Sequence, residues 1–495
     1  MSSVPFVSDR RSLEAKNFRI ENRVALWLKA LVALTALALV LMPPLFLIDK
    51  APIGAIASLS GLGLAMGLVT GLPIWRGRFS LFNPTLFYTV IYGITFWLRP
   101  FLVMVAPANY SLKWISYSDN GMLSATWLGA VGFGVFCLGY FSPLCSVVYG
   151  AMPQPASYLR KDRVATAVIL GSILCLLSTV YFLNKANRSI WDVYTTATYD
   201  ERVGLLRGDG EVIVLLRLAC WVTAVLAYWL RLSSRRGTLV RSLLAGVPVL
   251  MVFLLLAFGA RAPVVTLLGT LLVIRNYVIR PISARNAMVF ALLGLIALAV
   301  WGQYRLSWSA NFLEDYDPVT MTQKVGEDFP EWDILAAITD HYPLGQDYYY
   351  GRLSWESLYT LVPRRFWTTK PIWYGPDQIS NDVFPGVLAV SAEGGFQGTF
   401  LSTGTVGGGY AEFGWVGGLA AMFIFGVLWR TIYRYVEDKT PTFAAAALFG
   451  YCWSGLPLHM RFFSTTIVSL AIDIGGALLV FALVGGRNGR VPVPK

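Results

Sequence analysis

Long apolar stretches recur along the whole chain and constrain its fold more than any other feature. The stretch from Val24 to Ile48 is the clearest, because it contains a single charged residue, Lys29. A helix that crosses a bilayer needs about 20 predominantly apolar residues. The sequence therefore predicts an all-α polytopic membrane protein with about 12 transmembrane helices. We place them at 25–48, 52–74, 84–106, 122–142, 164–184, 211–231, 239–258, 262–280, 286–303, 415–436, 442–458 and 464–484.

The composition supports a membrane protein and argues against the soluble classes. Hydrophobic residues make up 56% of the chain and charged residues 14%, whereas a soluble chain carries about 25% charge. The five cysteines show no metal-ligand spacing, and no Walker A, zincin or nucleophile-elbow motif is present. We therefore expect no metal and no cofactor. The net charge of +12 indicates cytoplasmic Lys and Arg residues, with membrane lipids and not nucleic acid as partners.

The distribution of Lys and Arg predicts the orientation. With the first residues in the cytoplasm, 23 of the 40 basic residues fall in cytoplasmic segments, which agrees with the positive-inside rule. Both ends are then cytoplasmic. The predicted organisation is a cytoplasmic tail at 1–24, transmembrane helices one to nine within 25–303, one large outer loop at 304–414, helices ten to twelve within 415–484, and a tail at 485–495.

The outer loop at 304–414 is the one large soluble portion of the chain. It holds 14 of the 28 acidic residues and is rich in aromatic residues, including Tyr348-Tyr349-Tyr350 and Phe366-Trp367. Stretches 331–341 and 353–362 read as helices. A loop of this length without a strand pattern usually carries function.

Arginines near the ends of spans are the first candidates for binding. Arg261 follows a strongly apolar run and precedes Pro263 by two residues, which suits the first turn of a helix. A guanidinium beside free backbone N–H groups makes an anion site, for example for pyrophosphate. The alternative is that Arg261 reaches the lipid headgroups.

A second basic group lies in the acidic outer loop. Arg352, Arg364 and Arg365 lie close together in sequence and suggest a local anion site. The alternative is a set of salt bridges to Glu356 or Asp340.

Two histidines and one glutamate are the candidates for acid–base chemistry. His341 follows Asp340, which could orient its imidazole, and His459 lies two residues from Arg461 at the mouth of the last two spans. The alternative for each histidine is a surface role. Glu412 lies where the chain re-enters the membrane, and a carboxylate there is costly unless it is paired or functional. Arg217 and Asp473 lie within spans, and we expect them to pair with each other or with backbone groups.

Three stretches together resemble a known family. They are Gly259-Ala260-Arg261, then Pro363 to Pro371 downstream of Tyr350-Gly351-Arg352, and Gly408-Gly409-Tyr410-Ala411-Glu412-Phe413-Gly414-Trp415 before the next span. With the span pattern and the single large loop, the chain resembles bacterial O-antigen or exopolysaccharide repeat-unit polymerases of the Wzy type. This family is related in architecture to the O-antigen ligases.

The resemblance implies a GT-C-like glycosyltransferase of the bacterial inner membrane with its active site facing the periplasm. It would polymerise oligosaccharide units linked to undecaprenyl pyrophosphate, without metal or cofactor, and a chain-length regulator is a further expected partner. His341 would be the base by analogy with the ligases' loop histidine, with Glu412 as the alternative. The residues expected to bind pyrophosphate or glycan are Arg261, Arg352, Arg364, Arg365, Arg461, His459 and Tyr410.

Two other functions remain open from the sequence. An O-antigen ligase would share the fold and use a different acceptor. A transporter of lipid-linked glycan would place charges deep within the helical bundle and would show internal pseudo-symmetry, which is not visible in the sequence.

Overall fold

The fold is taken from a computed structural model in which two compact units are distinguished. Unit 1 comprises Met1–Leu138 and Gly294–Asp340, and unit 2 comprises Gly139–Leu293 and His341–Lys495. We describe each unit by itself. The structure describes residues 10–75, 82–112, 115–156, 158–185, 210–234, 237–257, 261–282, 286, 289, 329–362, 366–371, 375–385, 389–390, 396–397, 403–437, 441–460 and 463–485.

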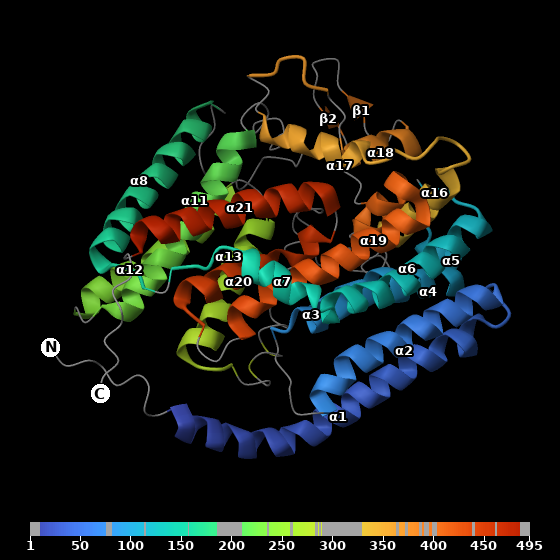
Figure 1. The fold of residues 1–495 in the computed structure, drawn as a ribbon, viewed down its shortest axis with the longest axis horizontal. Helices are drawn as coiled ribbons and strands as arrows, with labels where there is room; N and C mark the ends of the chain where they lie inside the picture. Colours follow the sequence, from blue (N-terminus) through green and yellow to red (C-terminus); the bar gives the residue numbers. More distant parts are fainter. Residues whose placement is uncertain are drawn as a thin grey trace, which may run out of the picture. The chain divides into compact units, whose positions relative to one another are not determined.

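Unit 1 is built from helices in its described part (Figure 1). They are α1 (Arg10–Leu47), α2 (Ile53–Trp75), α3 (Pro84–Gly93), the π-helical η1 (Ile94–Leu98), α4 (Arg99–Val105), α5 (Pro107–Tyr110), most of α6 (Asp119–Phe141), and α16 (Glu331–His341) up to its penultimate residue. The helix predicted at 331–341 is α16, so that prediction is confirmed.

Unit 2 contains the remaining helices and a small hairpin of two-residue antiparallel strands. Its elements are α7 (Leu144–Ala151), α8 (Lys161–Lys185), α11 (Gly210–Ser233), α12 (Thr238–Ala257), α13 (Arg261–Ile274), the π-helical η2 (Arg275–Ile279), α17 (Arg352–Glu356), the 3₁₀ helix η3 (Ser357–Leu361), α18 (Pro376–Val383), β1 (Ala389–Val390), β2 (Phe396–Gln397), α19 (Gly404–Glu437), α20 (Phe443–His459) and α21 (Phe463–Val484). The helix predicted at 353–362 is present as α17 and η3.

Nine helices in the described residues are long and apolar enough to cross a membrane. They correspond to the first eight predicted spans and the tenth, so the chain has the character of a polytopic membrane protein. Helices α20 and α21 occupy the eleventh and twelfth predicted segments, and α20 is 17 residues long. The ninth segment, 286–303, lies almost entirely outside the described residues.

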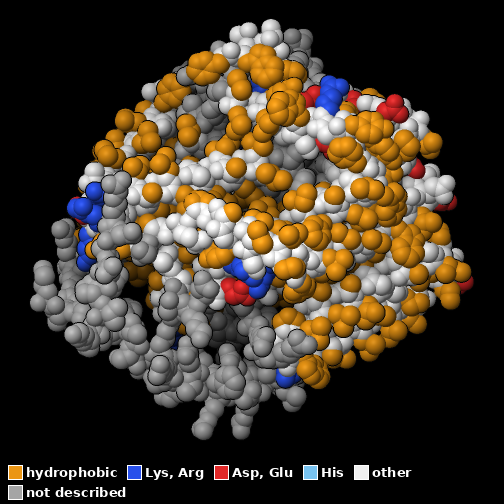
Figure 2. All heavy atoms as spheres, in the orientation of Figure 1, with side chains coloured by type: hydrophobic (Ala, Val, Ile, Leu, Met, Phe, Trp, Pro, Cys, Tyr) orange, Lys and Arg blue, Asp and Glu red, His pale blue; other side chains and the backbone are white. Residues whose placement is uncertain are grey.

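Lipid explains both the helices and their surfaces. Backbone N–H and C=O groups have no water to bond within a bilayer, so a helix satisfies them internally. Large apolar side chains can then remain on the outside: Leu34 is 65% exposed, Leu45 71% and Leu177 63%. The described side chains on the face drawn in Figure 2 are accordingly mostly hydrophobic, with few charged groups.

Small residues allow the helices to approach one another. In unit 1, a Cβ atom on Gly63 of α2 would lie 2.6 Å from the carbonyl oxygen of Leu39 on α1, and one on Gly67 would lie 2.5 Å from the Ala36 Cβ. Close backbone contact through a small-xxx-small pair is the usual mode of helix association in lipid. In Figure 1, α2 runs beside one part of the longer helix α1.

Helix α19 contains a sharp break that the sequence did not predict. Phe413 (φ −145°, ψ 26°) and Gly414 (φ 63°, ψ −146°) have non-helical backbone angles. A positive φ favours glycine, which explains Gly414. The helix begins at Gly404, within the segment predicted as loop up to 414. A Cβ on Gly409 would lie 2.5 Å from the Gly417 carbonyl oxygen, so the two halves of α19 pack against each other beside the break.

Candidate functional site

Glu412 lies at the break of α19 and joins it to helix α17. Its side chain is buried, 5% exposed. Its Oε2 accepts a hydrogen bond from the Gly351 backbone N at 2.6 Å, and its Oε1 accepts one from the Ser354 backbone N at 2.5 Å. The backbone of the same region is joined as well, since the Tyr350 N donates to the Glu412 carbonyl oxygen at 2.9 Å. Both carboxylate oxygens therefore cap the first turn of α17.

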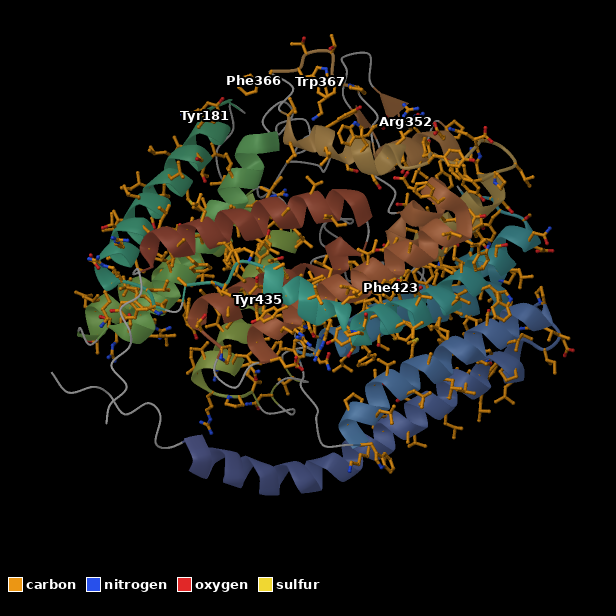
Figure 3. The ribbon with its side chains drawn as sticks, in the orientation of Figure 1. Tyr181, Arg352, Phe366, Trp367, Phe423 and Tyr435 are labelled. Carbon is orange, nitrogen blue, oxygen red and sulfur yellow. The ribbon has the colours of Figure 1, made fainter. Side chains whose placement is uncertain are left out.

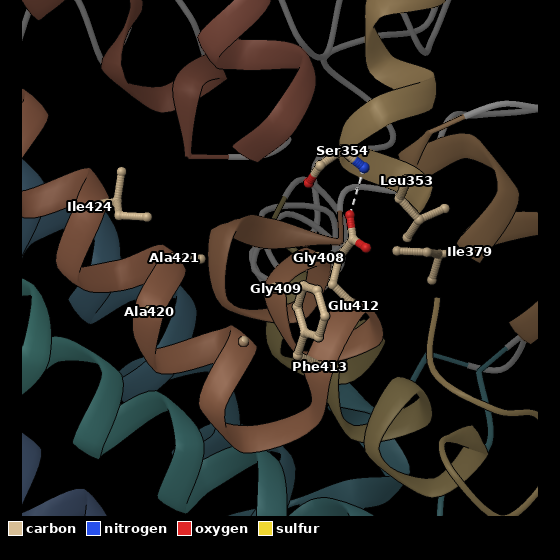
Figure 4. Close-up of a pocket in the computed structure, with 11 residues that line it drawn as sticks. Leu353, Ser354, Ile379, Gly408, Gly409, Glu412, Phe413, Ala420, Ala421 and Ile424 are labelled. Carbon is tan, nitrogen blue, oxygen red and sulfur yellow. Dashed lines mark hydrogen bonds between the residues drawn. The ribbon is translucent and has the colours of Figure 1, made fainter. Parts of the chain in front are cut away.

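A cavity of about 210 Å³ borders this carboxylate (Figure 4). Glycines and alanines of α19 form one wall, and Leu353, Ser354 and Ile379 contribute the other side. The cavity descends along α19 as far as Ile424. Apart from Glu412 and Ser354, the lining side chains are apolar or absent, so the space suits an apolar group whose polar end meets the α17 cap.

A cluster of tyrosines lies beside the break. The ring of Tyr348 is 5.9 Å from that of Tyr410 and 6.4 Å from that of Tyr342. The Tyr410 hydroxyl donates to the Tyr342 carbonyl oxygen at 3.4 Å. The Tyr349 backbone N donates to the Ala411 carbonyl oxygen at 3.0 Å. Segment 342–350 is therefore fixed onto the first half of α19 by both backbone and ring contacts.

Two of these tyrosines form a buried hydrogen-bonded chain. The Tyr342 hydroxyl lies 3.4 Å from that of Tyr349, which in turn bonds the Asp382 carboxylate. Burial raises the pKa of both phenols above the ordinary value. The chain links α18, which carries Asp382, to the tyrosine cluster, and both hydroxyls stay protonated near neutral pH.

His341 ends α16 and lies next to the tyrosine cluster. Its ring contacts that of Tyr342 at 4.9 Å in an edge-on arrangement. Its Nε2 is buried and has no hydrogen-bond partner among the described residues. A buried polar atom without a partner is uncommon and indicates a functional group or a missing ligand. Of the predicted acid–base candidates, His341 is the one whose reactive nitrogen is uncommitted in the described part of the chain.

Asp340 does not orient His341, contrary to the interpretation from the sequence. Within unit 1 its two carboxylate oxygens accept hydrogen bonds from Ser118, one from the backbone N and one from the side-chain hydroxyl at 2.6 Å. These bonds cap the start of α6, where Gly121 leaves room for the carboxylate. Asp340 thus attaches α16 to α6 through both of its carboxylate oxygens.

Arg352 is paired, as the alternative interpretation of the basic cluster anticipated. Its Nε lies 2.6 Å from the Glu356 Oε1, one helical turn away, while its side chain remains 60% exposed. The hydrogen bond with Glu356 raises the pKa of Arg352. The other Glu356 oxygen accepts from the Gly375 N at 3.2 Å. Arg352 therefore stiffens α17, and its exposed edge points away from the packed face.

Of the remaining predicted binding residues, the structure describes the backbone of two, Arg261 and His459. Arg261 begins α13, as predicted, but its side chain lies outside the described residues. The backbone of His459 ends α20, and its side chain is likewise outside them. Arg364, Arg365 and Arg461 lie outside the described residues altogether.

The intramembrane charges Arg217 and Asp473 do not form the expected direct pair. The Asp473 Oδ2 accepts from the Tyr451 hydroxyl at 2.5 Å, and no ion pair within 4.0 Å joins it to Arg217. The Arg217 Nε is buried without a partner in the described part of unit 2. A third residue, Tyr451, thus takes the place that the sequence assigned to the arginine.

Of the predicted set in unit 2, His341 and Tyr410 both contact Tyr342, whereas Glu412 meets the start of the helix that Arg352 opens. Sequence reasoning missed Tyr342, Tyr349 and Asp382, whose hydrogen bonds link the tyrosine cluster to α18 and α19. The run Tyr348-Tyr349-Tyr350 was a visible signal, but nothing in it distinguished the buried Tyr349 from its exposed neighbour Tyr350. Among the described residues, no group of three or more His, Cys, Asp or Glu side chains could hold a metal ion.

Comparison with known proteins yields no relative. No protein-family model matches the chain, and neither a curated protein nor a solved structure matches it.

Proposed function

We propose that the chain is a membrane glycosyltransferase that polymerises oligosaccharide repeat units carried on undecaprenyl pyrophosphate. The proposal includes a GT-C-like fold of twelve spans, with the tyrosine cluster on the periplasmic face of the inner membrane. It rests on the resemblance of three sequence stretches and on the site chemistry. Support from the fold is the polytopic helical architecture with nine long apolar helices in the described residues.

The observation that carries the proposal is the buried, unpartnered Nε2 of His341 beside the tyrosines. Glycosyl transfer to a sugar hydroxyl needs one group that accepts the hydroxyl proton, and an imidazole is the usual choice near neutral pH. Tyrosine rings offer flat apolar faces to pyranose rings and a hydroxyl for hydrogen bonding. Tyr348 supplies such a face on the segment that packs onto α19, since its ring contacts those of Tyr410 and Tyr342, and Tyr342 contacts His341.

Glu412 remains the alternative base, although each of its oxygens already accepts one backbone N–H group of α17. Each oxygen keeps a second lone pair, so the proposal prefers His341 because its Nε2 has no partner among the described residues. In the proposal Glu412 positions α17, and with it the tyrosine segment, relative to α19.

The pyrophosphate leaving group requires cations. Positive charge near the departing oxygens stabilises the transition state for its departure. Arg261 is assigned this role because it opens α13, where free N–H groups of a helix start add to the guanidinium. Arg364, Arg365, Arg461 and His459 remain predicted ligands.

The experiment is a surface-polysaccharide ladder from a strain that lacks the gene, complemented with variants. We expect wild type to restore a ladder, and Arg261→Ala and His341→Ala to fail at normal expression. The matched controls are Arg160→Ala, an exposed arginine paired with Asp162, and Leu344→Ala, which is 91% exposed three residues from His341. Both controls should restore the ladder.

The deletion strain separates the functions. Single repeat units on the lipid A core would identify a polymerase. No units there, with long polymer still on the carrier lipid, would identify a ligase. A ladder unchanged by the deletion would exclude both enzymes. Full restoration by His341→Ala would remove this residue from catalysis while leaving the function in place.

One observation favours a transporter of lipid-linked glycan as a second candidate. Arg217 lies within the α11 span and Asp473 midway along α21, and ionisable residues inside a membrane often line a substrate path. A transporter would leave undecaprenyl-linked units on the cytoplasmic side when deleted. Lectin-based detection of the units on right-side-out vesicles distinguishes this outcome from a polymerase defect.

A further inference from the structure

Helix α17 and the following turn η3 expose a row of apolar side chains outside the predicted spans. Trp355 is 67% exposed, Leu358 38% and Val362 39%. Trp355 lies in α17, Leu358 lies in η3, and Val362 directly follows η3. Leu353, Glu356 and Ser357 of the same segment are buried. A surface helix usually turns its apolar side toward the protein core. Here an apolar row is exposed instead.

The buried side of the segment rests on two transmembrane helices. Glu412 of α19 caps the first turn of α17, and both α17 and η3 contact α21. Leu353 and Ser354 line the same cavity as Ile424, which lies well beyond the break and is 48% exposed on α19. The segment thus overhangs the side of α19 that, within a span, faces lipid.

The exposed apolar row is continuous with that side of α19. Tyr350, just before α17, contacts the ring of Phe413 at 6.3 Å. Phe413 is 50% exposed and Val416, on the next turn, 76%. The exposed aromatic and aliphatic side chains therefore continue from Val416 on α19, across the break at Phe413, to Tyr350.

Arg352 adds a cation at the start of the row. Its side chain is 60% exposed although it pairs with Glu356. In Figure 3, Arg352 and Phe366 both lie on the side of unit 2 away from Tyr435, which is near the far end of α19. Phe366 is 73% exposed. Tryptophan, aromatic rings and a basic residue beside a span end are the composition of the membrane–water interface.

We propose that α17–η3 is an interfacial helix, whose row of Trp355, Leu358 and Val362 lies in the phospholipid leaflet at the Glu412 end of α19. Arg352 then lies at the level of the lipid phosphates. A glycan platform would pair its aromatic rings with hydrogen-bonding side chains, whereas this row alternates tryptophan with aliphatic residues. The surface fits hydrocarbon, and it does so whether or not the chain is a glycosyltransferase.

The test is spin-label accessibility in the full chain reconstituted in phospholipid nanodiscs. Nitroxide labels are attached to Trp355→Cys and Leu358→Cys, and to Asp347→Cys, an exposed acidic position five residues before α17, in a chain whose five native cysteines are replaced by alanine. We expect collisions with oxygen to exceed those with a water-soluble nickel chelate several-fold at 355 and 358. The opposite ratio is expected at 347.

Two results would overturn the proposal. Nickel accessibility at 355 and 358 equal to that at 347 would place the row in water. Low accessibility to both reagents would mean that another part of the protein covers it.

Hydroxyl-radical footprinting of the unmodified protein in the same nanodiscs gives an independent measurement if a variant does not fold. A water-exposed Trp355 would be oxidised at a rate approaching that of the unfolded chain. If the leaflet covers Trp355, its oxidation should be several-fold slower. Oxidation at the rate of the unfolded chain would contradict the proposal.

Discussion

Arg99 and Asp333 form an ion pair that joins α4 to α16 within unit 1. The Arg99 Nε lies 2.7 Å from the Asp333 Oδ2, and the two side chains are 3% and 0% exposed. Tyr117 donates a further hydrogen bond to Asp333 at 3.2 Å. Arg99 directly follows the π-helical η1, a wider turn that precedes Pro100, which has no N–H to donate.

We expect removal of one partner of this pair to destabilise unit 1 strongly. Arg99→Met leaves the Asp333 carboxylate buried without its cation, which costs about 3–5 kcal/mol. The double variant Arg99→Met/Asp333→Leu removes both charges and should recover most of the loss. The measurement is thermal unfolding in detergent. A double variant no more stable than Arg99→Met alone would contradict the pair as the cause.

The contact between the two halves of α19 gives a prediction with a matched control. A Cβ on Gly417 would overlap the Gly409 carbonyl oxygen, whereas one on Gly408 would meet only the Thr403 Oγ1 at 3.5 Å. Gly417→Ala should therefore lower the free energy of unfolding by about 1–3 kcal/mol through overpacking. Gly408→Ala should be neutral or slightly stabilising. Equal melting temperatures for the two variants would show that the halves are not in close contact.

The sequence predicted the helices better than it predicted their ends and breaks. Apolar runs of span length determine where helices form, since lipid leaves the backbone no alternative. The break at Phe413–Gly414 depends on a tertiary contact, the packing of Gly409 on Gly417. Periodicity and hydropathy do not encode such a contact, so a segment predicted as loop is the first half of a helix.

The sequence predicted which residue types the candidate site contains, but it did not predict which residues contact one another. His341 was identified because an imidazole suits a general base near neutral pH, and Glu412 because a carboxylate near a membrane is costly. Which of them is free depends on contacts between distant segments: Glu412 meets α17, and Asp340 meets Ser118. Arg352 pairs with Glu356, one turn away on the same helix. The sequence offered this local pair as the alternative to an anion site.

Glu412 should control the local stability of α17 more than the global stability of the chain. Glu412→Ala removes the acceptor for the Gly351 and Ser354 amides, and hydrogen bonds to a charged group contribute about 1.5–3 kcal/mol each. Hydrogen–deuterium exchange of peptides covering 349–356 should accelerate at least tenfold. The control is Glu437→Ala, which breaks an exposed pair with Arg430 on the same helix and should leave this exchange unchanged.

The chain from Tyr342 through Tyr349 to Asp382 should make the loop sensitive to alkaline pH. Burial raises the pKa of the Tyr349 hydroxyl, so the native state keeps its proton where the unfolded chain, with a tyrosine pKa near 10, loses it. The Tyr349 hydroxyl therefore makes its full contribution to the free energy of unfolding below about pH 10, and this contribution is lost as the pH rises further. Tyr349→Phe should cost about 1 kcal/mol at pH 8.

The melting temperatures of wild type and Tyr349→Phe should become more similar above about pH 10. Wild type loses stability there because its unfolded chain gives up the Tyr349 proton, whereas phenylalanine has no proton to lose. Melting temperatures at pH 8 and pH 10.5 measure this effect. Tyr350→Phe is the control, since Tyr350 is 67% exposed and contacts Phe413 through its ring at 6.3 Å, a contact that phenylalanine keeps. A gap between wild type and Tyr349→Phe that stays constant with pH would show that this hydroxyl is hydrated and not held by Asp382.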